Sequence, residues 1–267
     1  MIAETLRRLR TAAFRAASPA DALLRRAAGK TALPPLWLRR HTGSVARFES
    51  AARETGVFLD SLGLVEPGHV VLDVGCGAGA MVPEFARRIG TRGRYVGFDV
   101  HAPSIRWCRR RFADDPRLSF EDARVASPYG GPSGPATTTY RFPVDDGAAD
   151  LVLAKSVFTH LLPEDAGHYL REIRRVLRPG RTAVVTAFLF DPSGPELDGV
   201  RAAFPWEGRG GLVRGRLRSR PTAAVAYARP LFDELVSSAG LRLAWFSPGW
   251  YPGSARLSGQ DSLLLGH

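Results

Sequence analysis

The chain has 267 residues, 45% of them hydrophobic, which suits one large domain or one domain with a modest cap. Its formal net charge of +11 is compatible with binding to nucleic acid or to an anionic membrane. Yet 35 of its 37 basic residues are Arg, which favours a general composition bias over a dedicated binding surface.

The N-terminal part, residues 1–64, is predicted to be a helical segment or cap on a main domain formed by residues 65–267. Within it, Leu6, Leu9, Ala13 and Phe14 share one side of an amphipathic helix that arginines surround. Such a helix suits a membrane surface, a partner or its own domain, and we expect docking on its own domain. A second helix is predicted from about residue 48 to 62.

A glycine-rich segment follows the first predicted strand. Residues 70–79 read Val-Val-Leu-Asp-Val-Gly-Cys-Gly-Ala-Gly, and a helix-compatible stretch begins at Met81. Glycines let the backbone turn sharply and let a ligand approach, and the next helix offers free N–H groups. The pattern predicts a strand–loop–helix cradle for a ligand.

The remaining elements alternate between strand and helix. Strands are predicted at residues 94–99, 118–122, 150–154, 182–190, 241–246 and 260–265, with helices at 103–112, from 163 to about 177, and at 231–239. A long loop is expected at 126–143, and an irregular insertion rich in Gly, Pro and Arg at 191–228. This order predicts an α/β fold with a doubly wound, mostly parallel, seven-stranded sheet.

Acidic residues end the strands where such a sheet binds its ligand. Asp99 lies 20 residues after Gly79, the spacing of an acid that binds ribose hydroxyls, so a dinucleotide is one candidate. The glycine pattern is G-x-G-x-G, however, and Asp73 would repel a pyrophosphate. An acid there suits a ligand with an ammonium group, such as S-adenosylmethionine, which has ribose and adenine but no phosphate.

The sequence here resembles the class I S-adenosylmethionine-dependent methyltransferases. Residues 72–79 look like their first motif, and 96–99 look like their acidic second strand. Residues 121–123, 150–161 and 172–180 are similar to the later motifs in the family's order. The likeness covers residues 65–190 well and 229–265 more loosely. Arg181 departs from it, because the family often has a second glycine there.

The resemblance implies specific cofactor contacts. The loop backbone would hold the methionine part, Asp73 its ammonium, and Asp99 the ribose hydroxyls. Val100 would pack on the adenine, whose amino group and ring nitrogen would meet Asp122 and the Ala123 N–H. Lys155 and Ser156 would lie near the methionine end. The implied cofactor-binding residues are therefore Asp73, Gly75, Cys76, Gly77, Gly79, Asp99, Val100, Asp122, Ala123, Lys155 and Ser156. The alternative for Asp99 or Asp122 alone is a helix cap or a solvated turn.

Catalytic candidates are few. His160 follows the fourth strand and is the best general base, although it could simply pack or cap the next helix. His41 could reach the site from the cap beside Arg39 and Arg40, or could lie in a solvated turn. Metal-binding relatives carry acids where this chain has Ser156 and Thr159, so no metal is expected.

Acceptor-binding candidates come from the cap, the insertion and the C-terminal part: Trp37, Arg40, Trp206, Arg209 and Tyr251. Core packing would explain the aromatic residues equally well. Arginines crowd residues 201–220, which suits either an anionic acceptor or a solubilising loop.

These features predict a methyltransferase that acts on a small-molecule acceptor, expected to be a hydroxyl oxygen, in bacterial biosynthetic or tailoring metabolism. Carbon or nitrogen methylation is the first alternative. Nucleic-acid methylation is disfavoured, because residues 154–157 lack the Asn/Asp-Pro-Pro-aromatic signature. A non-catalytic cofactor-binding protein is a further alternative. A homodimer is left open, and stable membrane insertion is not expected.

Overall fold

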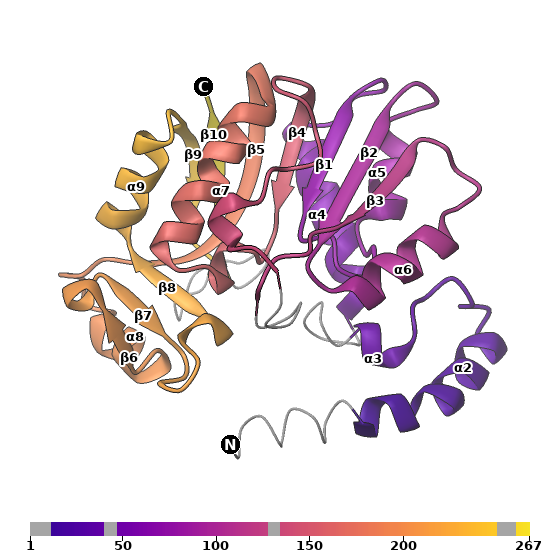
Figure 1. Cartoon of the computed structure of the whole chain (residues 1–267), viewed down its shortest axis with the longest axis horizontal. Helices are drawn as coiled ribbons and strands as arrows, with labels where there is room; N and C mark the ends of the chain where they lie inside the picture. Colours follow the sequence, from indigo (N-terminus) through magenta and orange to yellow (C-terminus); the bar gives the residue numbers. More distant parts are fainter. Residues whose placement is uncertain (1–11, 40–46, 128–133, 250–259) are drawn as a thin grey trace.

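The computed structural model describes residues 12–39, 47–127, 134–249 and 260–267, and its centre is a twisted sheet (Figure 1). Its first five strands are β1 (Val70–Val74), β2 (Arg94–Asp99), β3 (Leu118–Asp122), β4 (Ala149–Ala154) and β5 (Leu177–Phe190), parallel in the order β3-β2-β1-β4-β5. Strand β10 (Asp261–Gly266) runs antiparallel to β5 and to β9 (Arg242–Ser247). The predicted doubly wound, mostly parallel architecture is confirmed.

The insertion differs from its prediction, because it contains regular structure. It holds α8 (Leu197–Ala203), β6 (Trp206–Gly208), β7 (Val213–Gly215) and β8 (Val225–Ala228). All four residues of β8 are buried, and the strand pairs in parallel with Phe188–Phe190 of β5. Strand β7 runs antiparallel to both β8 and β6. The described sheet therefore has ten strands, seven as predicted and three from the insertion.

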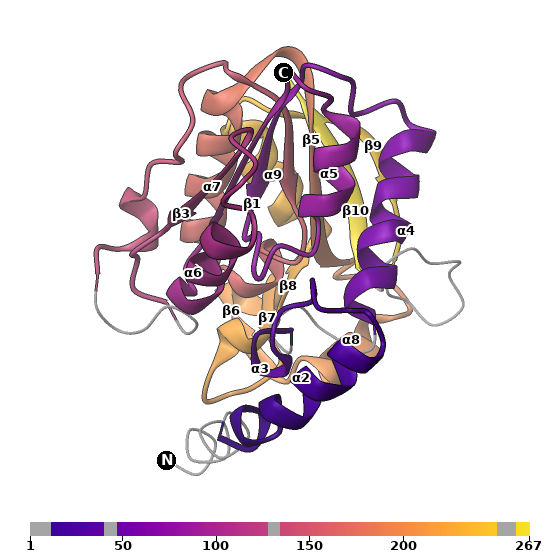
Figure 2. The same ribbon diagram turned by 90° about the vertical axis from the view of Figure 1, so that its right-hand side faces the viewer.

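Helices cover both faces of the sheet (Figure 2). On one face, α4 (Phe48–Ser61), α5 (Val82–Arg88) and α6 (Ala102–Arg111) pack into an apolar cluster with β1–β5 and β10. On the other, α7 (Pro163–Val176) and α9 (Arg229–Ser238) share a larger cluster with the sheet. Burying both faces explains the continuous apolar runs of β1, β4 and β5.

Ion pairs reinforce this frame in two places. Asp150, only 4% exposed, accepts the Val70 N–H at 2.9 Å and pairs with Arg178 and with Arg181. The departure at Arg181 thus supplies a charge to a buried carboxylate. Second, Arg88 of α5 bonds Asp60 of α4 at 2.6 Å, so α4 packs as a core helix.

The N-terminal part is attached more lightly. Helix α2 (Ser18–Ala27) has no buried residue, whereas in α3 (Leu36–Arg39) Leu38 is buried against Phe48 and Ala78 of the glycine loop. Helix α2 reaches α3 through an ion pair from Asp21 to Arg39. Leu6 and Leu9 of the predicted amphipathic helix lie outside the described residues, so docking of that helix on its own domain stays a prediction. Among the described residues, no helix is long and apolar enough to cross a membrane.

Candidate functional site

The glycine loop requires glycine for two reasons. Gly75, Gly77 and Gly79 have φ of 71°, 54° and 77°, in the left-handed region that favours glycine. A Cβ on Gly75 would also lie 2.7 Å from Cγ2 of Val157. The N–H groups of Gly75 and Cys76 both donate to the Phe98 carbonyl, at 2.9 and 3.0 Å. The loop is therefore folded tightly over the end of β2.

Asp99 ends β2 beneath this loop. Its two carboxylate oxygens accept the N–H groups of Gly77 at 2.8 Å and His101 at 2.7 Å. Desolvation by burial raises its pKa, despite these two hydrogen bonds. Asp99 thus performs the capping role, and each oxygen retains a second lone pair for a further donor. The structural and the cofactor-binding interpretations of Asp99 are compatible.

Asp122 is the residue opposite Asp99 in the β2–β3 register, so two carboxylates end neighbouring strands. The exposed Arg124 side chain lies 3.7 Å from Asp122. The next residue, Ala123, donates its N–H to the Asp99 carbonyl at 3.0 Å. In this structure the donor expected to meet an adenine ring nitrogen is therefore used within the protein, and its adenine contact stays a prediction. Val100 is half-buried beside the core.

Asp73 is 3% exposed and accepts a 2.7 Å hydrogen bond from the hydroxyl of Tyr95. Burial raises the pKa of Asp73 to about 7, although Tyr95 and Lys155 oppose this shift. Room for Tyr95 comes from Gly97, where a Cβ would lie 3.0 Å from both the Tyr95 hydroxyl oxygen and the Cys76 sulfur. The buried carboxylate is suited to a cationic partner.

Lys155 follows β4 and joins this edge of the sheet to α4. Its ammonium donates to the Thr55 hydroxyl at 2.6 Å and to the Ala51 carbonyl at 3.2 Å. Burial lowers its pKa, and the nearby Asp73 opposes that shift. Lys155 is thus the basic group that balances Asp73 at the buried end of the cradle.

Ser156 occupies a strained turn that neighbouring strands hold in place. Its φ is 61°, one of only two positive values for residues other than glycine in the described chain. Its N–H donates to the Thr186 hydroxyl at 2.7 Å, and its own hydroxyl bonds Gln260 at 3.2 Å. Thr186 in turn donates to Gln260 at 2.6 Å. Thr186 of β5 and Gln260, which precedes β10, therefore hold the turn that brings Val157 close to the glycine loop.

His160 lies in the short 3₁₀ turn Phe158–His160, where the insertion meets β4. Its Nδ1 bonds the Thr222 carbonyl at 3.0 Å. A carbonyl only accepts, so Nδ1 carries the proton and the lone pair lies on Nε2. Burial lowers the pKa of His160, with Arg220 adding to the shift, so the ring is neutral near pH 7. This is the state that a general base requires.

The structure places the acceptor-binding candidates in different parts of the chain, and their role stays a prediction. Trp37 lies in the cap, with the Arg15 guanidinium 5.0 Å from its ring centre and His101 against its edge. Trp206 packs beside the large core cluster, and Arg209 pairs with Glu164 of α7. Arg214 likewise pairs with Glu207 inside the insertion. These arginines therefore have acidic partners within the protein. The other predicted residues, Arg40, His41 and Tyr251, lie outside the described residues.

Sequence reasoning missed Tyr95, Thr55, Thr186 and Gln260. Tyr95 could have been found, because Asp73 pairs with Gly97 and Tyr95 lies two residues earlier on the same face. The other three depend on how α4 and β10 pack, which no local pattern shows. In the described ranges, no group of three or more His, Cys, Asp or Glu side chains is placed to hold a metal ion.

Comparison with known proteins shows which proteins parts of this chain are similar to. Residues 71–180 match a family model described as a methyltransferase domain. An uncharacterised 37.1 kDa protein of transposon TN4556 from Streptomyces fradiae is 29% identical over 141 residues, 53% of this chain and 36% of the relative. The ubiquinone/menaquinone biosynthesis C-methyltransferase UbiE of Hydrogenovibrio crunogenus is 29% identical over 124 residues, 46% of this chain and 44% of the relative. The chain thus spans less than half the length of these curated relatives.

Among solved structures, the 1,6-didemethyltoxoflavin-N1-methyltransferase of Burkholderia thailandensis has a TM-score of 0.53 and 20% identity, over 85% of this chain and 82% of that one. Its structure contains 1,6-didemethyltoxoflavin and S-adenosylhomocysteine. At this identity the likeness shows the fold alone.

Proposed function

We propose that the chain, whose residues 71–180 match a methyltransferase-domain model, is a class I S-adenosylmethionine-dependent methyltransferase that methylates a hydroxyl oxygen of a small-molecule acceptor. One observation carries the proposal: three carboxylates, those of Asp73, Asp99 and Asp122, surround a glycine loop with no room for a Cβ at Gly75. Acids suit a cofactor with an ammonium group and a ribose, and they oppose a diphosphate.

The residues fit the roles that the resemblance assigns. Asp73 would hold the ammonium, and the remaining lone pairs of Asp99 would accept the ribose hydroxyls. S-adenosylmethionine supplies, when bound, a methyl group on a sulfonium, from which the neutral thioether is a good leaving group. The chain's own contribution is to align the acceptor with that methyl, and alignment of this kind can lower a barrier by ~7–11 kcal/mol. The loop, the turn at Ser156 and α4 fix one side of this alignment.

Oxygen is favoured as the methylated atom because of His160. A hydroxyl must lose its proton as the oxygen–carbon bond forms, and Nε2 of the neutral ring has the lone pair that takes it. The Thr222 carbonyl holds Nδ1–H and would stabilise the imidazolium that results. His160 is thus the proposed base, oriented by the insertion.

Methylation at carbon or nitrogen is the second candidate, supported by the names of the C-methyltransferase and N1-methyltransferase relatives. An anionic acceptor is a narrower option, and the ion pairs of Arg209 and Arg214 reduce its support. We keep the division into a cap and a main domain, and a homodimer, as proposals.

An acceptor screen with isotope-labelled S-adenosylmethionine tests the function. We expect label in a phenol or alcohol, with the product assigned by nuclear magnetic resonance. For His160→Gln we expect at least a ~100-fold lower kcat at neutral pH and a flattened acid limb of the pH profile. His168→Gln is the control, because that ring bonds the Tyr140 carbonyl away from the turn. Label transfer to carbon with no effect of His160→Gln would contradict the oxygen assignment.

A further inference from the structure

Helix α2 exposes its apolar side chains. Leu23 and Leu24 are 67% and 71% exposed, and no residue of the helix is buried. In α4, by contrast, four residues are buried, including Leu59 at 0% exposure. Figure 1 shows α2 at the margin of the molecule, away from the sheet. An amphipathic helix with an uncovered apolar face has the character of a docking element.

Positive charge is concentrated in the same part of the chain. Residues 1–39 contain eight basic and two acidic residues, a net charge of +6, whereas the other 228 residues share the remaining +5. A composition bias would spread the charge evenly, so this asymmetry has a local cause. In the described part, Arg26 is exposed beside the two leucines.

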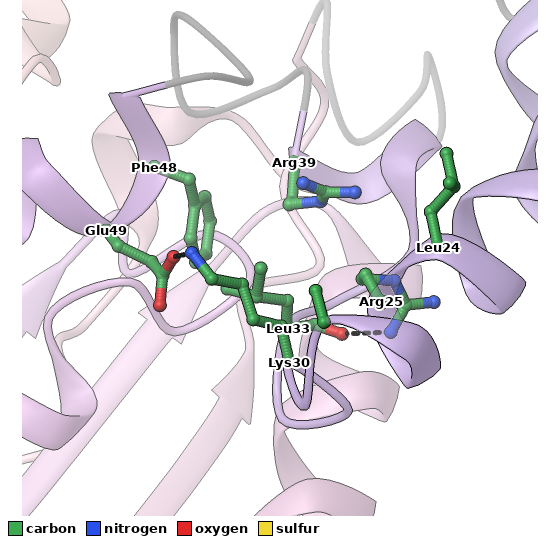
Figure 3. Close-up of a pocket in the computed structure, with 8 residues that line it drawn as sticks. Leu24, Arg25, Lys30, Leu33, Arg39, Phe48 and Glu49 are labelled. Carbon is green, nitrogen blue, oxygen red and sulfur yellow. Dashed lines mark hydrogen bonds and ion pairs between the residues drawn. The ribbon is translucent and has the colours of Figure 1, made fainter.

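A cavity of about 450 Å³ adjoins the exposed Leu24, between α2, α3 and the start of α4. Leu24, Leu33 and Phe48 supply apolar lining. Arg25, Lys30 and Arg39 also line the cavity, and they pair with two acids, Asp21 and Glu49, which leaves one positive charge in surplus. In Figure 3 Leu24 and Phe48 lie at opposite ends of the cavity, with Arg39 between them. Lys30 bonds Glu49 at 2.8 Å, and Arg25 donates to the Leu33 carbonyl at 2.7 Å. Apolar lining with surplus positive charge suits an amphiphilic anion.

We propose that the α2 surface, made of Leu23, Leu24, Arg26 and Lys30, docks reversibly on an anionic phospholipid membrane. The leucines enter the boundary between headgroups and acyl chains, and the basic residues attract the anionic headgroups. Nucleic acid is the weaker candidate, because phosphate recognition leaves the leucines and the apolar cavity without a role. Docking is interfacial and needs no membrane-spanning helix.

The position of α2 gives this docking a consequence for the site. Helix α3 connects α2 to the glycine loop, through Leu38 packed near Ala78. The ring of Trp37 in α3 also makes a T-shaped contact with the ring of His101, two residues after Asp99. A membrane bound at α2 would therefore lie beside the cap that contacts the cradle.

Sedimentation of the full chain with vesicles tests the proposal. Vesicles of phosphatidylcholine with roughly one-third phosphatidylglycerol are compared with pure phosphatidylcholine. We expect strong binding to the anionic vesicles and a loss on adding salt. The double variant Leu23→Ser/Leu24→Ser should weaken binding at least ~10-fold. Arg26→Gln should weaken it about fivefold.

Two matched controls separate docking from general effects. Val57→Ser replaces an apolar residue of α4 that is 66% exposed, and Arg106→Gln removes an exposed charge from α6. Both should bind vesicles as the unchanged protein does. Equal binding to neutral and anionic vesicles, or full binding by the double leucine variant, would overturn the proposal. A leucine-dependent dimer in light scattering, or preferred binding to RNA, would also overturn it.

Discussion

The glycine loop and the insertion are built differently. Around β1–β3, buried carboxylates and main-chain N–H groups form the site, and Asp99 itself holds the loop through Gly77 and His101. At the insertion, Arg209 pairs with Glu164 of α7 at the surface. The first arrangement depends on backbone geometry that only certain residues permit. The second depends on exposed contacts worth ~0–1 kcal/mol each, which constrain the sequence little.

The largest expected effect comes from filling the glycine loop. Gly75→Ala adds a Cβ 2.7 Å from Val157 at a φ of 71°, so the loop must shift. We expect the affinity for S-adenosylhomocysteine to fall at least ~100-fold by calorimetry, since a displaced loop loses several contacts together.

Gly147→Ala is the matched control, because its φ is 61° but nothing lies within 4 Å of the added Cβ. That variant should lose only ~1 kcal/mol of stability and keep cofactor affinity. Equal losses in both variants would mean that backbone strain, and not the contact with Val157, limits the loop.

The second-largest effect is expected in the pH dependence of cofactor affinity. Because the pKa of Asp73 is raised to about 7, its carboxyl is largely protonated at pH 5.5 and half ionised at pH 7. A cation binds the ionised form, so affinity for S-adenosylhomocysteine should rise roughly tenfold over this range. Asp73→Asn should bind weakly with a flat profile. A rise of the same size in Asp73→Asn would assign the titration to another group.

The smallest effect is expected from removing the hydrogen bond that Thr186 of β5 makes to the turn at Ser156. Thr186→Val leaves the Ser156 N–H without its 2.7 Å acceptor at a strained residue. We expect kcat to fall about tenfold, with cofactor Kd changed less than about threefold, since an unsatisfied buried donor costs ~1–3 kcal/mol. Thr182→Val, on the same strand, is the control. Loss of cofactor affinity equal to the loss of kcat would show a general scaffold defect instead.

The sequence predicts the elements that depend on local patterns better than those that depend on pairing with distant residues. Strand ends and glycines gave the boundaries of β2 and β3 to the residue, because periodicity and turn chemistry are local. The insertion was predicted as irregular, because β8 owes its pairing to the distant β5 and not to its own four residues. His160 was placed near the pocket, but its tautomer depends on Thr222, 62 residues away.

Calorimetric binding of S-adenosylhomocysteine to Asp99→Ala tests the central claim most directly, with the exposed Asp198→Ala of α8 as control. Asp99 joins the glycine loop to β2, and its proposed partners are the ribose hydroxyls of the cofactor. We predict nanomolar-to-micromolar binding by the unchanged protein and by Asp198→Ala, and at least a ~100-fold weaker Kd for Asp99→Ala. An unchanged affinity in Asp99→Ala, with the fold intact, would contradict the placement of the cofactor in this cradle.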